Sequence, residues 1–159
     1  MIPVNTGEAL DVFGPRVKFL SSLDFGEAEF TLIAGIVDPG VVVPLHSHPD
    51  RELFSIDEGA IEAFVADQWH TFNAGDVLDI RDGVRHAWRN MSEAPVKLLI
   101  VTTVRLGQFL QEIGRPLAAA NAPPSPGDVE KLTSTSIRYG YWNGSPEDNA
   151  AIGLSLPAG

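Results

Sequence analysis

The stretch His46-Ser47-His48-Pro49-Asp50-Arg51-Glu52 decides the fold of this chain. Side chains at i and i+2 of an extended chain point to the same side, so a strand here would direct His46 and His48 at one point. A carboxylate follows at Glu52, and a further histidine, His86, comes later in the chain. Three imidazoles and one carboxylate make a ligand set that suits a divalent transition metal.

Glycines around these residues complete two motifs. The first, over residues 40–59, reads G-x5-H-x-H-x3-E-x6-G, and the second, over residues 75–90, reads G-x5-R-x-G-x2-H-x3-N. Together they resemble the two motifs of the cupin superfamily. Fifteen residues separate Gly59 from Gly75, which is typical of small bacterial cupins. Arg81 departs from the family pattern, which usually has proline at this position.

The resemblance covers residues 41–104 and implies a small β-barrel with one divalent metal inside. The implied ligands are His46, His48, Glu52 and His86. Iron, manganese, nickel, zinc and copper all accept such a donor set, so the metal is left open. The resemblance also implies a pocket near the metal, to which we assign Phe54, Trp88 and Arg81.

The remaining sequence favours the same fold class without the family. Short, apolar, β-branched runs separated by turn residues predict an antiparallel barrel or sandwich. A hairpin with its turn at Asp67-Gln68 is expected between two of them. We therefore predict an all-β fold, an antiparallel double-stranded β-helix or jelly-roll barrel, with two short C-terminal helices. The predicted strands are 31–37, 41–43, 53–56, 61–65, 77–80 and 96–104.

Beyond residue 104 the apolar period changes from two to about 3.6. Leu106, Phe109, Leu110 and Ile113 predict one helix, ended by Gly114 and Pro116. A second helix is expected from an N-cap at Ser125 to Gly140, with an apolar face of Val129, Leu132 and Ile137, and residues 143–159 are expected to be irregular.

We divide the chain into a barrel domain with an N-terminal arm, residues 1–104 with its core at 30–104, and an extension, residues 105–159. This helical tail resembles the extensions of some bacterial cupins described by similarity to quercetin dioxygenase. We expect the extension to pack on the barrel or on a dimer partner. A lid over the barrel mouth is the alternative.

Composition limits the partners. With 11 Lys and Arg against 21 Asp and Glu, the net charge of −10 argues against nucleic acid and acidic membrane surfaces. The absence of cysteine leaves oxygen and nitrogen as metal ligands. The first eight residues lack the pattern of a signal peptide, so we expect a cytoplasmic protein. A homodimer is expected, through edge strands or the swapped segment 1–10.

Each site residue also has a simpler explanation. The three histidines could be satisfied by hydrogen bonds in a barrel that binds no metal. Glu52 could ligate the ion, act as a general base, or pair with Arg51 or Arg85. Arg81 could clamp a substrate carboxylate or enolate, or lie in solvent with Arg85 and Arg89. His70 has no motif partner and is expected on the outside of its hairpin.

The sequence therefore predicts a metal-binding barrel acting on a small enolic, aromatic or carboxylate substrate. Oxygenation of the kind that dioxygenases perform is the favoured reaction. Metal-dependent polyketide cyclisation or isomerisation is the rival, because a metal with open positions can also act as a Lewis acid. A non-catalytic metal-binding or ligand-binding module is the alternative from another class. Open coordination positions and an open cavity would distinguish the enzymes from the module.

Overall fold

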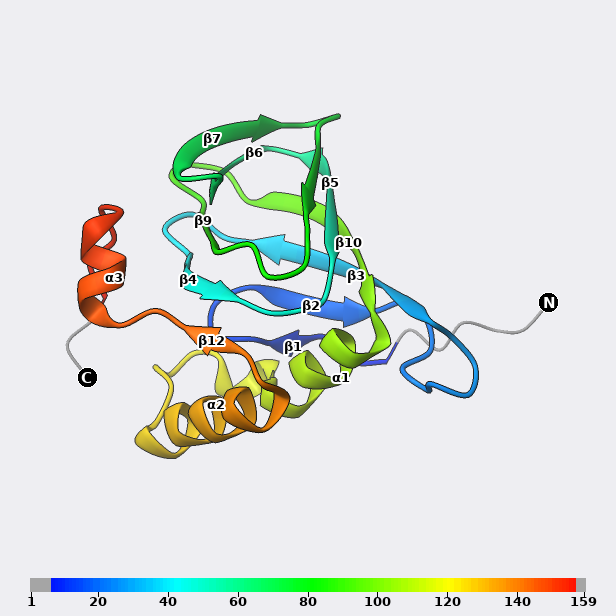
Figure 1. Cartoon of the computed structure of the whole chain (residues 1–159). Helices are drawn as coiled ribbons and strands as arrows, with labels where there is room; N and C mark the ends of the chain where they lie inside the picture. Colours follow the sequence, from blue (N-terminus) through cyan, green and yellow to red (C-terminus); the bar gives the residue numbers. More distant parts are fainter. Residues whose placement is uncertain (1–6, 157–159) are drawn as a thin grey trace.

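The computed structural model describes residues 7–156, in which two antiparallel sheets face each other and the helices lie outside them (Figure 1). The larger sheet has seven strands and the smaller has five. In spatial order the larger sheet contains β11 (Arg115–Pro116), β1 (Leu10–Asp11), β2 (Arg16–Phe19), β3 (Phe30–Val37), β10 (Val96–Thr103), β5 (Glu52–Glu58) and β8 (Val77–Ile80). The smaller sheet contains β12 (Trp142–Asn143), β4 (Val42–Ser47), β9 (His86–Arg89), β6 (Ala60–Val65) and β7 (Gln68–Asn73).

The core lies between the two sheets. Every second residue of β3 is buried, with Ile33 and Val37 fully covered, and Ile61 and Ala63 of β6 face them from the other sheet. Burial of each isoleucine or valine side chain among them stabilises the fold by about 1.5–3 kcal/mol. The predicted all-β barrel is therefore confirmed, and each of the six predicted runs is a strand.

The hairpin of β6 and β7 turns one residue earlier than the sequence predicted. Ala66 and Asp67 form the turn, with φ of 52° and 62°, and Gln68 already pairs with Val65. Two central residues with positive φ match the twist of the flanking strands, which is why such turns close tight hairpins. The expected turn at Asp67-Gln68 is corrected accordingly.

The first helix, α1 (Val104–Ile113), follows β10 directly and packs against the larger sheet. Thr103 caps it, and Leu106, Phe109 and Ile113 are buried as predicted. Gly107 allows a close approach to β3, because a Cβ there would lie 2.8 Å from a methyl carbon of Thr31. The sequence periodicity therefore identified the face that docks on the sheet.

The second helix, α2 (Pro126–Tyr139), comes after a 3-10 turn, η1 (Leu117–Ala119). Ser125 caps it with Asp128 in a capping box, and Gly140 ends it with a φ of 73°. These limits confirm the predicted ends. Its apolar face is corrected, since Ile137 is 73% exposed.

Residues 143–156 are more ordered than the sequence predicted. A third helix, α3 (Pro146–Ala151), and the strand β12 lie in this region (Figure 1). Asn149 anchors α3: its side-chain oxygen accepts a hydrogen bond from the Leu45 N–H at 2.9 Å. No helix within residues 7–156 is long and apolar enough to cross a membrane. Of the segment expected to swap in a dimer, residues 1–6 lie outside the described residues.

Candidate metal centre

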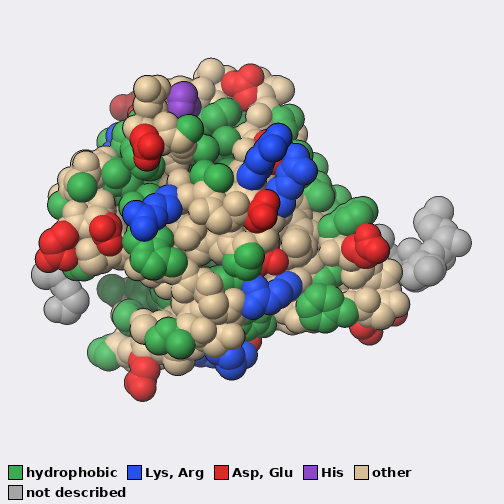
Figure 2. Space-filling model, in the orientation of Figure 1, with side chains coloured by type: hydrophobic (Ala, Val, Ile, Leu, Met, Phe, Trp, Pro, Cys, Tyr) green, Lys and Arg blue, Asp and Glu red, His purple; other side chains and the backbone are tan. Residues whose placement is uncertain are grey.

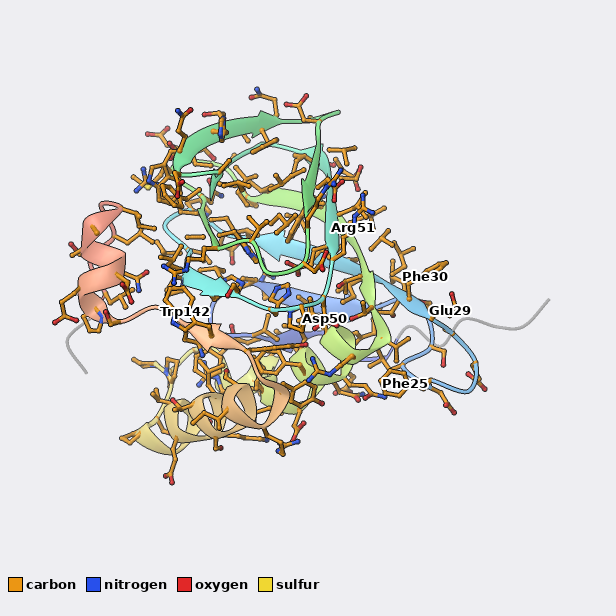
Figure 3. All side chains as sticks on the ribbon, in the orientation of Figure 1. Phe25, Glu29, Phe30, Asp50, Arg51 and Trp142 are labelled. Carbon is orange, nitrogen blue, oxygen red and sulfur yellow. The ribbon has the colours of Figure 1, made fainter. Side chains whose placement is uncertain are left out.

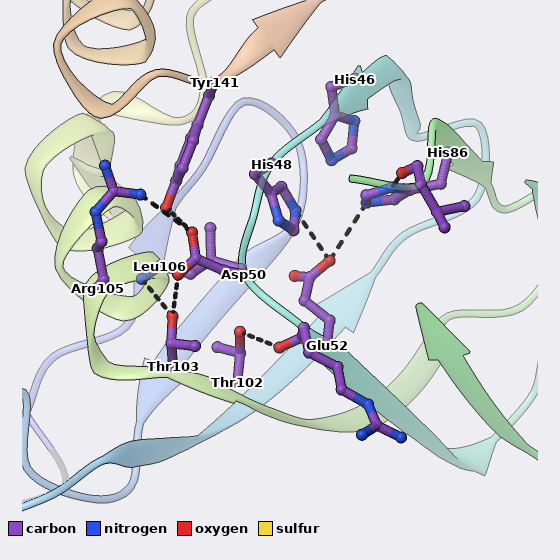
Figure 4. Close-up of polar contacts among 12 residues, drawn as sticks. His46, His48, Asp50, Glu52, His86, Thr102, Thr103, Arg105, Leu106 and Tyr141 are labelled. Atoms are coloured by element: carbon purple, nitrogen blue, oxygen red, sulfur yellow. Dashed lines mark hydrogen bonds and ion pairs between the residues drawn. The ribbon is translucent and has the colours of Figure 1, made fainter. Parts of the chain in front are cut away.

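Both sheets contribute to the cluster of histidines. His46 of β4 lies directly opposite His86 of β9, and His48 follows the end of β4. Glu52 begins β5 in the other sheet, and its carboxylate reaches across to the imidazoles (Figure 4). The i, i+2 spacing predicted that His46 and His48 share one side, and the structure brings them together.

The distances within this cluster suit a single ion. One ring nitrogen from each of His46, His48 and His86 lies within 4.8 Å of the others. Oε2 of Glu52 is 3.3 Å from Nε2 of His48 and 3.3 Å from Nε2 of His86. Glu52 therefore lies where it can bind an ion held by the imidazoles, or take a proton beside it.

Backbone carbonyls fix two of the rings. Nδ1 of His46 is 2.7 Å from the carbonyl oxygen of Pro44, and Nδ1 of His86 is 2.8 Å from that of Val84. Each Nδ1–H therefore donates to the backbone, which leaves the Nε2 lone pair free for a metal. Nε2 of His86 is buried, and the Glu52 carboxylate oxygen lies 3.3 Å from it. In the neutral ring this nitrogen carries a lone pair, so a cation bound beside it would satisfy both the imidazole and the carboxylate.

The electrostatics of the cluster favour a neutral His46 and a charged Glu52. Burial, with repulsion from His86, lowers the pKa of His46 to about 3. Burial works against the charge of Glu52, but hydrogen bonds from His48 and His86 outweigh it and lower the pKa of the carboxyl. Burial also opposes a charge on His48, yet the hydrogen bond to Glu52 raises the pKa of this ring. Without a metal, Glu52 therefore favours the protonated form of His48, and a proton competes with a metal for this ring.

Beside these residues, Asp50 joins the barrel to the extension. Its carboxylate accepts hydrogen bonds from the Tyr141 hydroxyl at 2.6 Å and the Thr103 hydroxyl at 2.6 Å, and pairs with Arg105 at 3.3 Å (Figure 4). Burial and the neighbouring Asp50 raise the pKa of Tyr141, so the phenol stays protonated. The Tyr141 ring lies beside His48, with centroids 5.3 Å apart. The extension therefore contacts the histidine cluster directly.

Sequence analysis missed Asp50 and Tyr141. Asp50 stands inside the stretch that decides the fold, but it points inward to the extension whereas the neighbouring Arg51 points to solvent (Figure 3). Tyr141 directly follows the glycine that ends α2, and no spacing in the sequence links it to the histidines. Only the tertiary fold pairs residues that are 91 positions apart.

A cavity of about 400 Å³ opens onto His46, His48 and Glu52, whereas His86 is buried and is not among the lining residues. Phe54 and Trp88 line it as predicted, with their rings edge-on and centroids 5.9 Å apart. The surface is hollowed between α2 and α3, and hydrophobic side chains lie deep in the hollow (Figure 2). Val129 of α2 and Leu156, which follows α3, are among the cavity residues. A path to the ligands therefore runs past the extension.

The pocket assignment of Arg81 is corrected. This side chain is exposed in the turn between β8 and β9 and is not among the residues that line the cavity. Cζ of Arg85 lies 4.2 Å from the centroid of the Trp142 ring, and Nε of Arg89 pairs with Oε2 of Glu62 at 3.2 Å. All three arginine side chains lie on the outside of the barrel, at strand ends or on outward faces. His70 is exposed on the outer hairpin, as predicted.

Two facing antiparallel sheets with histidines at their shared end define a β-barrel of the double-stranded β-helix class, with a site suited to a metal. Residues 35–102 match the family model of the cupin domain. Residues 35–102 therefore form a cupin domain, as the two motifs indicated. Comparison with curated proteins gives no match.

Solved structures agree on the fold. A Cupin 2 conserved barrel domain protein from Salinispora arenicola covers 84% of this chain and 95% of its own, with 20% identity and a TM-score of 0.53. The polyketide cyclase RemF from Streptomyces resistomycificus has 18% identity and a TM-score of 0.57, with 65% of this chain and 78% of its own covered. A predicted oxalate decarboxylase from Thermotoga maritima has 21% identity and a TM-score of 0.54, covering 64% and 98%. At these identities the likeness establishes the fold and not the activity.

Proposed function

We propose that this protein is a metal-dependent enzyme that binds a small molecule through an oxygen atom at the cluster of His46, His48, His86 and Glu52. The observation that carries the proposal is the position of this cluster at an open cavity. A site that only stores a metal has no need of a cavity, whereas an enzyme needs room for a substrate beside the ion. Oxygenation is the reaction we favour.

A divalent ion held there would supply Lewis acidity and, if redox-active, the means to use oxygen. The chain supplies the rest. Glu52 is ionised and lies beside the imidazoles, so it can accept the proton of an enolic or phenolic hydroxyl. Phe54 and Trp88 form an apolar wall that orients a flat ring and excludes water.

Metal content tests this proposal first. Protein purified without added metal or chelator is analysed by plasma mass spectrometry, beside the variant His86→Ala. Near-stoichiometric iron, nickel, copper or manganese in the natural chain, lost in the variant, supports the proposal. Oxygen-uptake assays on enols and flavonols then test the reaction.

Stoichiometric zinc would move the proposal to the Lewis-acid rival, a metal-dependent cyclase or isomerase. The polyketide cyclase RemF shares the fold, which makes cyclisation of a polyketide-like molecule the first activity to assay in that case. A protein that refuses every added divalent metal overturns the proposal. What would remain is a barrel that binds a ligand without chemistry at a metal.

A further inference from the structure

The cavity has two different ends. At one end lie the histidines and Glu52, and at the other the wall is built by α1, α2 and the turn between β1 and β2. The second end includes Phe13, Leu106, Phe109, Leu110, Val129 and Leu132. None of these six residues falls within residues 35–102, the segment that matches the family.

Charge is confined to the metal end. Among the described residues that line the cavity there is no lysine, arginine or aspartate. Besides His46, His48 and Glu52, the only ionisable group among them is the Tyr141 phenol. Two arginines of the extension are engaged elsewhere: Arg105 pairs with Asp50, and Arg115 pairs with Asp11 at 2.8 Å. A negative group placed among the helices would therefore lose its hydration without gaining a partner.

Phe13 is held in a strained conformation at this apolar end. Its φ is 59°, in the left-handed region that aromatic residues rarely adopt. The turn is fixed because the Gly14 N–H donates to the Asp11 carboxylate at 3.0 Å and the Val12 N–H to the Pro15 carbonyl at 2.8 Å. Strain of this kind persists where the surrounding structure imposes it, and it is frequent at ligand clamps. The ring packs against the cluster formed by α1 and Tyr141.

We propose that the extension is the substrate-binding wall of the site, and that the substrate is an amphiphile with one oxygen-bearing end and an uncharged, apolar body. The oxygen-bearing end lies at the histidines, and the body lies between the barrel and the helices α1 and α2. The position of the oxygen-bearing end rests on the proposed function, whereas the position of the apolar body rests on the cavity alone. The apolar end of the cavity disfavours substrates with a second charge at the end remote from the histidines, such as sugar phosphates, because that charge would have no partner.

Two probes with the same aromatic body test the proposal. N-phenyl-1-naphthylamine is neutral, and 1-anilinonaphthalene-8-sulfonate adds one negative charge to the same body. In fluorescence titrations of the metal-free protein we expect the neutral probe to bind at least about tenfold more tightly. The only cation that the sulfonate could meet in the cavity is protonated His48, which is already paired with Glu52 at 3.3 Å. Equal affinities, or tighter binding of the sulfonate, overturn the proposal.

Two tryptophan variants of α2 locate the bound probe. Leu132→Trp fills the cavity from its wall and should weaken the neutral probe at least about fivefold. Ile137→Trp adds the same side chain on the exposed face of the helix and should leave the affinity unchanged. If both variants bind the probe alike, it lies elsewhere and the proposal fails. Should Leu132→Trp unfold by circular dichroism, Leu110→Trp, on α1, takes its place.

The outcomes separate this inference from the proposed function. Probe binding in a protein that takes up no metal would support the cavity assignment and overturn the metalloenzyme. Stoichiometric metal in a protein that does not bind the neutral probe would support the metalloenzyme and overturn the cavity assignment.

Discussion

The barrel and the extension meet at the same cavity but contribute different chemistry. Barrel strands place charged and metal-binding groups at fixed positions, through pairs such as His46 with His86. The extension contributes apolar side chains from its helices and one hydrogen-bonded tyrosine, Tyr141, which follows α2. The comparison teaches that the groups proposed to bind the metal and the apolar wall proposed to bind the substrate body come from separate parts of the chain. A barrel that holds the ion can then serve different substrates as its extension changes.

The largest effect should come from removing a barrel ligand. His86→Ala is expected to lower metal affinity by more than about 100-fold, beyond the 10- to 100-fold typical of residues that only support a ligand. Competition with a chromogenic chelator measures the affinity. His70→Ala is the matched control, because this exposed histidine lies outside the site. Unchanged affinity in His86→Ala would remove His86 from the ligand set.

The second effect is a pH dependence that also belongs to the barrel. Because Glu52 raises the pKa of His48, a proton competes with the metal, and metal affinity should rise as the pH increases from about 5 to 8. Glu52→Gln removes the charge that retains this proton, so the rise should move to lower pH. Chelator competition across this range measures both. An identical pH profile for the two proteins would show that Glu52 does not control His48.

The metal-free protein should respond to pH in the opposite direction. The pair of protonated His48 and Glu52 raises the free energy of unfolding, fully so at pH values below about 6.5, the pKa of a histidine in the unfolded chain. This contribution is lost as the pH rises through the higher pKa of the folded state. Urea denaturation of the metal-free protein at several pH values should therefore show a decline that Glu52→Gln lacks.

A smaller effect tests the contact between the two regions. Tyr141→Phe leaves the buried Asp50 carboxylate without one of its donors and should lower the free energy of unfolding by about 1–3 kcal/mol. Tyr139→Phe is the control, since its hydroxyl donates a longer bond of 3.2 Å to Glu112. Urea denaturation gives both values. If Tyr141→Phe lowers metal affinity as much as His86→Ala does, metal binding depends on the extension as well as on the barrel.

The smallest effect should be confined to the extension. Ser125→Ala removes the N-cap of α2 and is expected to cost about 1 kcal/mol of stability. Ser134→Ala, on the exposed side of the same helix, should cost less. Both variants should keep their metal affinity. A change in metal affinity in Ser125→Ala would mean that the end of α2 is coupled to the barrel ligands.

The barrel was predictable because its signals are local. Short apolar, β-branched runs mark strands such as β3. The i, i+2 spacing of His46 and His48 predicted that both side chains point to one side. Capping signals also work over short distances, which is why Ser125 and Gly140 gave the limits of α2 correctly.

The rest depended on contacts that no local pattern carries. Asp50 meets Tyr141 only after the extension folds back on the barrel, and Arg81 turns outward because of the course of its loop. The helix α3 is six residues long and has no apolar period, although Ser145 and Asp148 form a capping box that could have marked its start. Short strands such as β12 exist only because a partner strand is present.

The pairing of β12 with β4 has a consequence for any attempt to isolate the barrel. Trp142 and Asn143 pair with Ser47 and His46, and the Gly144 N–H donates to the Leu45 carbonyl at 2.8 Å. A fragment cut after β10 would leave these backbone groups unsatisfied along the strand that carries His46. Exposed strands of this kind recruit strands of other chains. The shortened protein should therefore aggregate through its metal-binding strand, and the extension acts as a built-in protection against such association.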